Sequence, residues 1–150
     1  MGDGIRLRRR IGKNGLIYNG EKTLVQGVFT DLSTQSGRVF SVGSSSIHGS
    51  GNSASARISG VDFEGFTKLC FIVTTTTSSD TYSPNFKFGL AKSSALGFSY
   101  VSGCSKTVSS VVTKATYKID ISNADKNGAV IGMNISNAYT NAQIYKIWLE

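Results

Sequence analysis

Three tyrosines are the residues of this sequence best suited to hold a ligand. Tyr82, Tyr100 and Tyr139 each fall in or beside a segment rich in serine, threonine and asparagine. An exposed aromatic ring can stack on the apolar face of a sugar ring, while nearby hydroxyl and amide groups bind the sugar's hydroxyls. We therefore take these tyrosines as candidate glycan-binding residues. The alternative is that they pack against loop stems or a neighbouring subunit.

Residues with catalytic potential are few. The one histidine, His48, falls in a Gly/Ser-rich stretch without the partners of a catalytic triad or metal site, so we interpret it as a solvated loop residue. Asp62 and Glu64 share one face of an extended segment, and paired acids can hydrolyse glycosides. Two acids on one short segment more often form a solvated edge. The sequence therefore predicts no catalytic residue and a structural or binding protein rather than an enzyme.

Metal and cofactor signals are equally weak. Asp125 and the following Asn127–Gly128 faintly resemble a calcium loop, but the bidentate acid that should follow is missing, so a plain turn is favoured. We predict no metal site and no cofactor, and leave open a structural calcium ion held by backbone carbonyls. Cys70 and Cys104 lack the spacing of metal ligands, and Cys70 lies in an apolar run. We expect two free thiols rather than a disulfide.

Size and composition suit a soluble domain with a real core. The chain has 150 residues, of which 39% are hydrophobic and only 17% charged, and serine, threonine, glycine and asparagine fill the polar positions. Such composition is typical of extracellular or virion β-proteins. No apolar run approaches the roughly 20 residues of a spanning helix, and the N-terminus lacks the apolar segment of a secretory signal. We expect residues 1–150 to form a single domain without a signal peptide or membrane insertion.

The net charge of +7 is concentrated at the N-terminus, where residues 1–13 form a basic strand or arm. The arm contains Arg6, Arg8, Arg9 and Arg10. Basic arms can bind nucleic acid, but no aromatic RNA-binding motif, zinc knuckle or recognition helix accompanies these arginines. We therefore favour a strand with a solvated or partner-facing edge over a nucleic-acid contact.

Alternation of apolar and polar residues recurs along the chain, without a helical period of useful length. Residues 44–55 are instead expected to form a flexible Gly/Ser/Asn loop. Many short strands separated by turns predict an all-β fold, an antiparallel two-sheet sandwich of jelly-roll type. The predicted strands are 5–11, 16–18, 23–29, 38–42, 56–58, 69–73, 86–90, 98–101, 108–112, 117–121, 129–135 and 144–149.

Some faces can be assigned within these strands. Residues 69–73 are apolar on both faces, which predicts a central strand. Trp148 should lie opposite Tyr145, but the sequence does not decide whether Trp148 is core, interface or ligand platform. Asn134 begins a glycosylation sequon, and its place in a buried-looking strand argues against use.

Several motifs resemble small structural proteins of phages and prophages of Gram-positive bacteria. The motifs are Ile5–Leu7 with Leu16–Gly20, Phe66–Leu69, Tyr117–Ser122 and Ile144–Glu150. The closing strands also resemble galactose-binding-like and carbohydrate-binding jelly rolls. These are core and turn residues, so the resemblance speaks for fold and setting and carries no functional residue across.

The resemblance implies a tail- or capsid-associated virion protein, assembled in the host cytoplasm as a homo-oligomer with other virion proteins as partners. It would contribute to adhesion to glycans on the host surface. In this setting Arg6, Arg8, Arg9 and Arg10 would form a subunit or virion contact. The alternative is a free-standing carbohydrate-binding module, which uses the three tyrosines alone.

Overall fold

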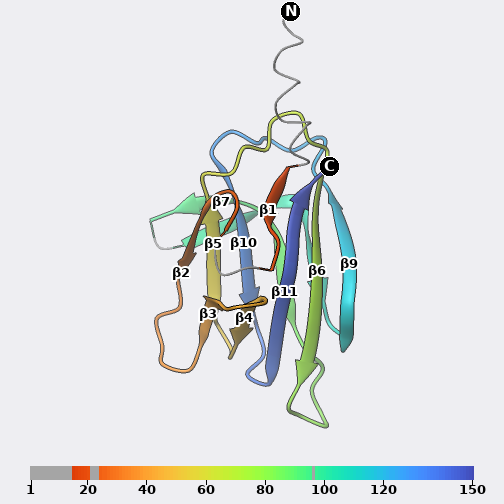
Figure 1. The fold of residues 1–150 in the computed structure, drawn as a ribbon. Coiled ribbons are helices and arrows are strands. Elements are labelled where there is room, and N and C mark those ends of the chain that lie inside the picture. The colour runs from red at the N-terminus through yellow and green to blue at the C-terminus, as the bar shows by residue number, and fades with distance from the viewer. Residues whose placement is uncertain (1–14, 21–23, 96) are drawn as a thin grey trace, which may run out of the picture.

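The chain folds into two antiparallel β-sheets packed face to face (Figure 1). The computed structural model describes residues 15–20, 24–95 and 97–150, and no helix occurs among them. This part of the chain therefore has no helix that could cross a membrane. Most strands that follow one another alternate between the sheets, as β5 (Ser55–Ser59), β6 (Lys68–Thr77) and β7 (Phe86–Ser94) do, which is the connectivity of a jelly roll. Two pairs, β3–β4 and β7–β8, are instead hairpins within one sheet. The predicted all-β sandwich is confirmed.

The first sheet, sheet A, has six strands in the order β3-β4-β11-β6-β9, with β1 also paired to β11. Its last strand along the chain, β11, lies centrally and pairs with β6 along its whole length. On the other side of β11, β4 pairs with the first half and β1 with the end. The bounds are β1 Leu16–Tyr18, β3 Val39–Val42, β4 Ile47–Ser50, β6 Lys68–Thr77, β9 Val112–Asp120 and β11 Thr140–Leu149.

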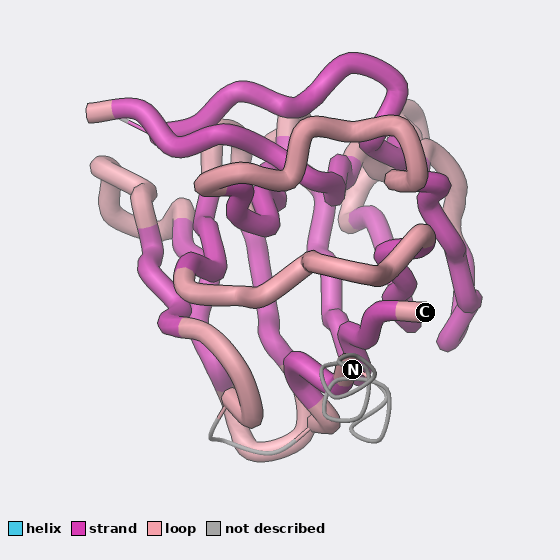
Figure 2. The backbone as a smooth tube through the Cα atoms, turned by 90° about the horizontal axis from the view of Figure 1, so that it is seen from above, coloured by secondary structure: helices cyan, strands magenta, loops and turns pink. Residues whose placement is uncertain are grey.

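The second sheet, sheet B, has five strands in the order β2-β5-β10-β7-β8. β10 lies in its centre between β5 and β7, and β7 forms a long hairpin with β8. Figure 2 views the sandwich from above Figure 1 and shows loops that run across its upper end. The bounds are β2 Val28–Asp31, β5 Ser55–Ser59, β7 Phe86–Ser94, β8 Gly97–Val108 and β10 Ala129–Ile135.

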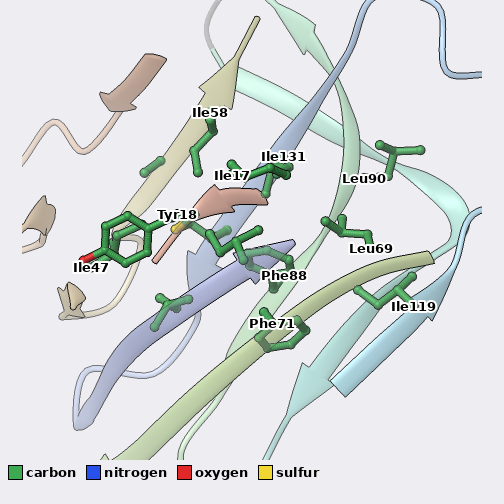
Figure 3. Close-up of a cluster of buried hydrophobic side chains, with 14 of the residues drawn as sticks. Ile17, Tyr18, Ile47, Ile58, Leu69, Phe71, Phe88, Leu90, Ile119 and Ile131 are labelled. Carbon is green, nitrogen blue, oxygen red and sulfur yellow. The ribbon is translucent and has the colours of Figure 1, made fainter. Parts of the chain in front are cut away.

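The core lies between the sheets and is built from the alternating apolar positions of each strand. Phe71 of β6 stacks on Phe88 of β7 with ring centroids 4.2 Å apart, which joins the two layers (Figure 3). Ile131 of β10 and Ile58 of β5 are also fully buried. Burying one such side chain contributes about 1.5–3 kcal/mol. The predicted central position of residues 69–73 is confirmed, because β6 has a strand on each side.

The predicted flexible loop over residues 44–55 is wrong. It contains β4, which is paired on both edges, so His48 is a half-buried strand residue rather than a loop residue. Two core requirements explain the strand: Ile47 is fully buried, and a Cβ on Gly49 would lie 2.1 Å from the Phe40 ring. Gly49 is therefore required because the Phe40 ring packs against it, and it does not make the segment flexible.

Other strand boundaries also differ. Residues 98–101 and 108–112 were expected as two strands, but β8 runs unbroken from residue 97 to 108 and β9 begins at 112. The strand expected over 23–29 begins only at Val28. Residues 5–11 and the basic arm lie outside the described residues.

Trp148 and Tyr145 both lie on the outer face of sheet A, so the expected opposition between them is wrong. The cause is a register shift in β11 between Ile144 and Lys146, which turns Tyr145 outward. Its hydroxyl donates to Gln143 Oε1, 3.0 Å away. Trp148 is half-buried, and its Nε1 donates to the side-chain Oε2 of Glu150, 3.0 Å away.

The two cysteines are free and buried, as the sequence predicts. Burial, with a smaller contribution from the nearby Glu150 carboxylate, raises the pKa of Cys70 to about 11. Burial also raises the pKa of Cys104, and the Asp120 carboxylate adds to this. Both thiols are therefore held in the unreactive protonated form.

We expect neither thiol to react with a disulfide reagent such as DTNB at about pH 8, where an ordinary cysteine is partly ionised. Both should react once guanidinium has unfolded the chain, which serves as the internal control. Absorbance of the released thiolate measures the reaction. Modification of the folded protein at the rate of a free cysteine would contradict the buried placement.

Tyr18 carries a buried hydroxyl that has no hydrogen-bond partner in the described part of the chain (Figure 3). Its side chain is fully buried, and burial raises its pKa. Leaving such a group unsatisfied costs about 1–3 kcal/mol. Most of this cost disappears when the hydroxyl is replaced by hydrogen in the same ring.

The Tyr18→Phe variant should therefore be at least as stable as the natural chain, by about 0–2 kcal/mol in the free energy of unfolding. Urea unfolding followed by tryptophan fluorescence measures the difference. Tyr117→Phe, a change of the same kind on a partly exposed ring, is the matched control. A loss of more than about 1 kcal/mol in Tyr18→Phe would mean that the hydroxyl has a partner.

Candidate functional site

Two paired glycines leave the centre of sheet B without side chains on its outer face. Gly132 of β10 lies directly opposite Gly89 of β7, so neither strand places a side chain there. A Cβ on Gly132 would lie 2.4 Å from the ring of Phe98, and a Cβ on Gly89 would lie 2.4 Å from the Cys104 carbonyl oxygen. Both glycines are therefore required for close approach of β8, not for an unusual backbone angle.

A register shift in the β7–β8 hairpin brings β8 over this bare centre. Gly89 pairs with Ser105, whereas two residues later Ala91 pairs with Tyr100, so residues 101–104 bulge out of the ladder. Beyond the bulge, residues 97–100 approach β10 and β5. The Phe98 ring lies against the backbone of Gly132 as a result.

Arg57 fixes the hairpin tip from the other side. It projects from β5, and its Nη1 donates to the Gly97 carbonyl oxygen at 2.9 Å, with the Ser94 carbonyl oxygen at 3.4 Å. Charge-assisted bonds of this kind are among the stronger ones in proteins. They hold the guanidinium group and the two ends of the hairpin turn in one arrangement.

Tyr100 is positioned by hydrogen bonds rather than by apolar packing alone. Its hydroxyl donates to Asn134 Oδ1 at 2.5 Å and lies 3.2 Å from the Lys87 carbonyl oxygen. Burial raises the pKa of this hydroxyl, so it remains a neutral donor. The Asn134 amide nitrogen in turn donates to Ser136 Oγ at 3.3 Å. The Lys87 ammonium group lies 4.8 Å from the Tyr100 ring centroid.

Tyr100 and Asn134 line an open recess of about 350 Å³, which we call the sheet-B recess, and Arg57 lies at its rim through its hydrogen bond to Gly97. One wall is aromatic, because the Phe98 and Tyr100 rings meet at 81° with centroids 5.2 Å apart. The remaining wall is made of hydroxyl, amide and backbone groups. The lining residues are Ser55, Ser94, Gly97, Phe98, Tyr100 and Asn134. An apolar wall beside oriented polar groups is suited to binding a small polar ring.

The predicted ligand tyrosines separate into two places. Tyr100 lies in the sheet-B recess, on a strand rather than in a loop. Tyr82 and Tyr139 come together at another point, where their rings stack at 5.5 Å with an angle of 7° between planes. The sequence therefore indicated residues of two aromatic clusters but not how they group.

The acids for which the sequence disfavours a catalytic or calcium-binding role, Asp62, Glu64 and Asp125, line a second recess of about 410 Å³. The carboxylates of Asp62 and Asp125 stabilise turns. Asp62 Oδ1 accepts from the Glu64 amide at 3.0 Å, and Asp125 Oδ1 accepts from the Asn127 amide at 3.0 Å. The hydrogen bond from the Asn127 amide and, to a smaller extent, the Lys92 charge lower the pKa of Asp125.

Across residues 15–20, 24–95 and 97–150, no three His, Cys, Asp or Glu side chains gather as a metal site would require. Arg6, Arg8, Arg9 and Arg10 lie outside the described residues.

Of the residues that line the sheet-B recess, sequence reasoning indicated only Tyr100, and it also missed Arg57 at the rim. The missed lining residues are Phe98, Asn134, Ser55, Ser94 and Gly97. Asn134 had been placed in a buried-looking strand, but it lies on the outer, half-exposed face, because the inner face takes Met133 and Ile135. The available signal was Gly132, a glycine on the polar face of an otherwise regular strand, which often marks close approach of another chain segment.

No family model matches the chain, and no curated protein matches it. Similarity appears only in the fold. The chain resembles an alanine variant of the carbohydrate-binding module CBM29-2, with a TM-score of 0.58 and 13% identity over 90% of this chain and 89% of that one.

Two further solved structures are similar. A CBM29-2 variant complexed with mannohexaose has a TM-score of 0.59 and 13% identity over 88% of this chain and 86% of that one. The K2 cleaved adhesin domain of Lys-gingipain has a TM-score of 0.54 and 12% identity over 88% and 92%. At such identities the likeness shows the fold alone, a β-sandwich of the jelly-roll type that the sequence predicts.

The contact between the Phe98 ring and Gly132 can be tested by adding a methyl group at Gly132. Gly132→Ala should lower the free energy of unfolding by about 1–3 kcal/mol, because the added methyl group overlaps the Phe98 ring. Urea unfolding measures the loss. Gly97→Ala is the matched control, since a Cβ there meets nothing within 4 Å.

The double variant Gly132→Ala, Phe98→Ala should then lose less stability than the two single losses added together, because the overlap is gone. If Gly132→Ala and Gly97→Ala were equally stable, the ring would not lie against β10 as described.

Proposed function

We propose that this chain is a carbohydrate-binding module that holds a glycan in the sheet-B recess. The observation that carries the proposal is the corner formed by the Phe98 and Tyr100 rings beside the Arg57 guanidinium group, Asn134 and Ser55. A sugar ring has apolar C–H faces and a polar edge, and this corner offers a surface for each.

The roles divide between the two walls. Phe98 is half-exposed and supplies the surface on which a sugar ring stacks. Asn134 and Ser55 supply amide and hydroxyl groups for the sugar's hydroxyls. Tyr100 supports Phe98 edge to face and fixes the orientation of the Asn134 amide.

The site is ordered before a ligand arrives. Arg57, Asn134 and Tyr100 are each held by hydrogen bonds within the protein, so little rotamer freedom is left to lose on binding. The recess is open, so an oligosaccharide could continue past it over the sheet face. Binding without bond cleavage fits this arrangement, since the recess lining contains no acid or histidine.

The fold gives separate support, because the similar modules are carbohydrate-binding and one was solved with mannohexaose. The virion role and the oligomeric assembly implied by the sequence resemblance stay predictions. Neither the described residues nor the similar structures bear on them. A glycan-binding module would serve in a virion or as a free-standing protein.

Phe98→Ala should weaken binding of a recognised oligosaccharide at least about tenfold, which corresponds to about 1.4 kcal/mol. The loss follows from removal of the stacking surface. Mannohexaose and cellulohexaose are the first probes for isothermal titration calorimetry, followed by a glycan array to widen the choice. Tyr145→Ala, which truncates a half-buried ring on the outer face of sheet A, is the matched control.

Equal affinity of the natural chain and the Phe98→Ala variant would remove the sheet-B recess as the binding site. Absence of binding to every glycan on the array would remove the proposed function itself. Circular dichroism of each variant shows whether the sandwich is intact before binding is compared.

A further inference from the structure

A second aromatic cluster lies on loops at one end of the sandwich. The rings of Tyr82 and Tyr139 are nearly parallel, and we call them the tyrosine pair. Tyr82 is 56% exposed and Tyr139 is 43% exposed, although they cover one another on one face. No hydrogen bond engages either phenol hydroxyl in the described part of the chain. Such an exposed stack is unusual on a surface otherwise covered by small polar residues.

The loop that carries Tyr82 is fixed by its own hydroxyl groups. Ser79 Oγ accepts hydrogen bonds from the amides of Thr81 and Tyr82, at 3.0 and 3.1 Å. Thr77 Oγ1 donates to the Tyr82 carbonyl oxygen at 3.0 Å. These bonds hold the backbone of Tyr82 on both sides of its Cα atom.

The loop that carries Tyr139 is tied to the first loop as well as to itself. The Tyr139 amide donates to Asn137 Oδ1 at 2.8 Å, and Asn137 Nδ2 donates to the Ser83 carbonyl oxygen at 3.0 Å. The Ser78 amide donates to the Tyr139 carbonyl oxygen at 3.0 Å. The two loops therefore form one connected unit, and the tyrosine pair is ordered in advance.

The spacing of the rings limits how a ligand can use them. A layer stacked between two rings needs about 3.5–4 Å on each side. The ring centroids are only 5.5 Å apart, so no ligand ring fits between them. A ligand must lie on the outer face of one ring, which the other ring supports from behind.

The surroundings limit the ligand's charge. In segments 77–85 and 136–140 Asp80 is the single charged residue, and the others are mainly Ser, Thr and Asn. No basic group of these two loops is present to hold a carboxylate or sulfate. Hydroxyl groups beside an uncharged aromatic surface fit an uncharged ring with many hydroxyls.

We propose that the tyrosine pair is a second glycan-binding site, separate from the sheet-B recess, and that it takes a neutral pyranose unit. It extends the proposed function and does not depend on the recess. Two sites on one chain raise the apparent affinity for a polysaccharide that spans both, through effective concentration, without raising the affinity of either site for a short oligosaccharide.

The test uses the Phe98→Ala variant, in which the sheet-B recess is disabled. Mannohexaose and cellulohexaose are titrated calorimetrically, with hexagalacturonate as the acidic comparison. We expect one remaining site for a neutral hexaose and at least about tenfold weaker binding of hexagalacturonate. Adding Tyr82→Ala or Tyr139→Ala should weaken the remaining site at least about tenfold.

Two controls separate stacking from other effects. Tyr82→Phe keeps the ring and should keep most of the binding, whereas Val111→Ala removes a different exposed apolar side chain and should change nothing. Sedimentation of each variant shows whether the tyrosine pair instead joins two protein copies. Loss of self-association in Tyr82→Ala without any change in sugar binding overturns the proposal.

The two sites fail in distinguishable ways. Absence of neutral hexaose binding to the Phe98→Ala variant overturns the tyrosine pair as a site, and the natural chain then reports on the recess alone. Binding that survives both tyrosine substitutions also overturns it. Binding that is lost with the tyrosines but not with Phe98 supports the tyrosine pair and removes the recess.

Discussion

The pairing of Gly132 with Gly89 in the middle of sheet B is the constraint on which the candidate site depends. Because the two paired glycines place no side chain on the outer face, the Phe98 ring and the bulged part of β8 can lie directly against the backbone, which they bury. Any larger residue at Gly132 would push the aromatic wall outward. The recess therefore depends on the absence of side chains at Gly89 and Gly132 as much as on the residues that line it.

Hydrogen bonds then convert this close approach into a defined site. Arg57 fixes the hairpin tip through two carbonyl oxygens, and the Tyr100 hydroxyl fixes the Asn134 amide. These contacts come from three strands, β5, β8 and β10, that lie far apart in the sequence. The same principle orders the tyrosine pair, where hydroxyl and amide groups of two loops bind one another's backbone. In both places polar groups position aromatic rings.

The sequence predicted those parts of the fold that depend on local pattern. Residues 86–90 alternate strictly and residues 129–135 alternate except at Val130, so their inner faces were correctly assigned. β4 was missed because its glycine and serine content resembles a loop, and the reason for Gly49 is a ring nine residues away in the chain. Tyr145 was misplaced because a register shift inside β11 leaves no local mark. Likewise, composition indicated the tyrosines, but only strand pairing determines which of them meet.

The central claim is that the outer face of sheet B is a glycan-binding surface built around Phe98. A crystal structure of the chain with a bound hexasaccharide tests it most directly. The account predicts a sugar ring stacked on Phe98, with its hydroxyl groups within hydrogen-bond distance of Asn134, Ser55 or Arg57. A sugar bound elsewhere on the protein while the face of Phe98 stays bare would contradict it.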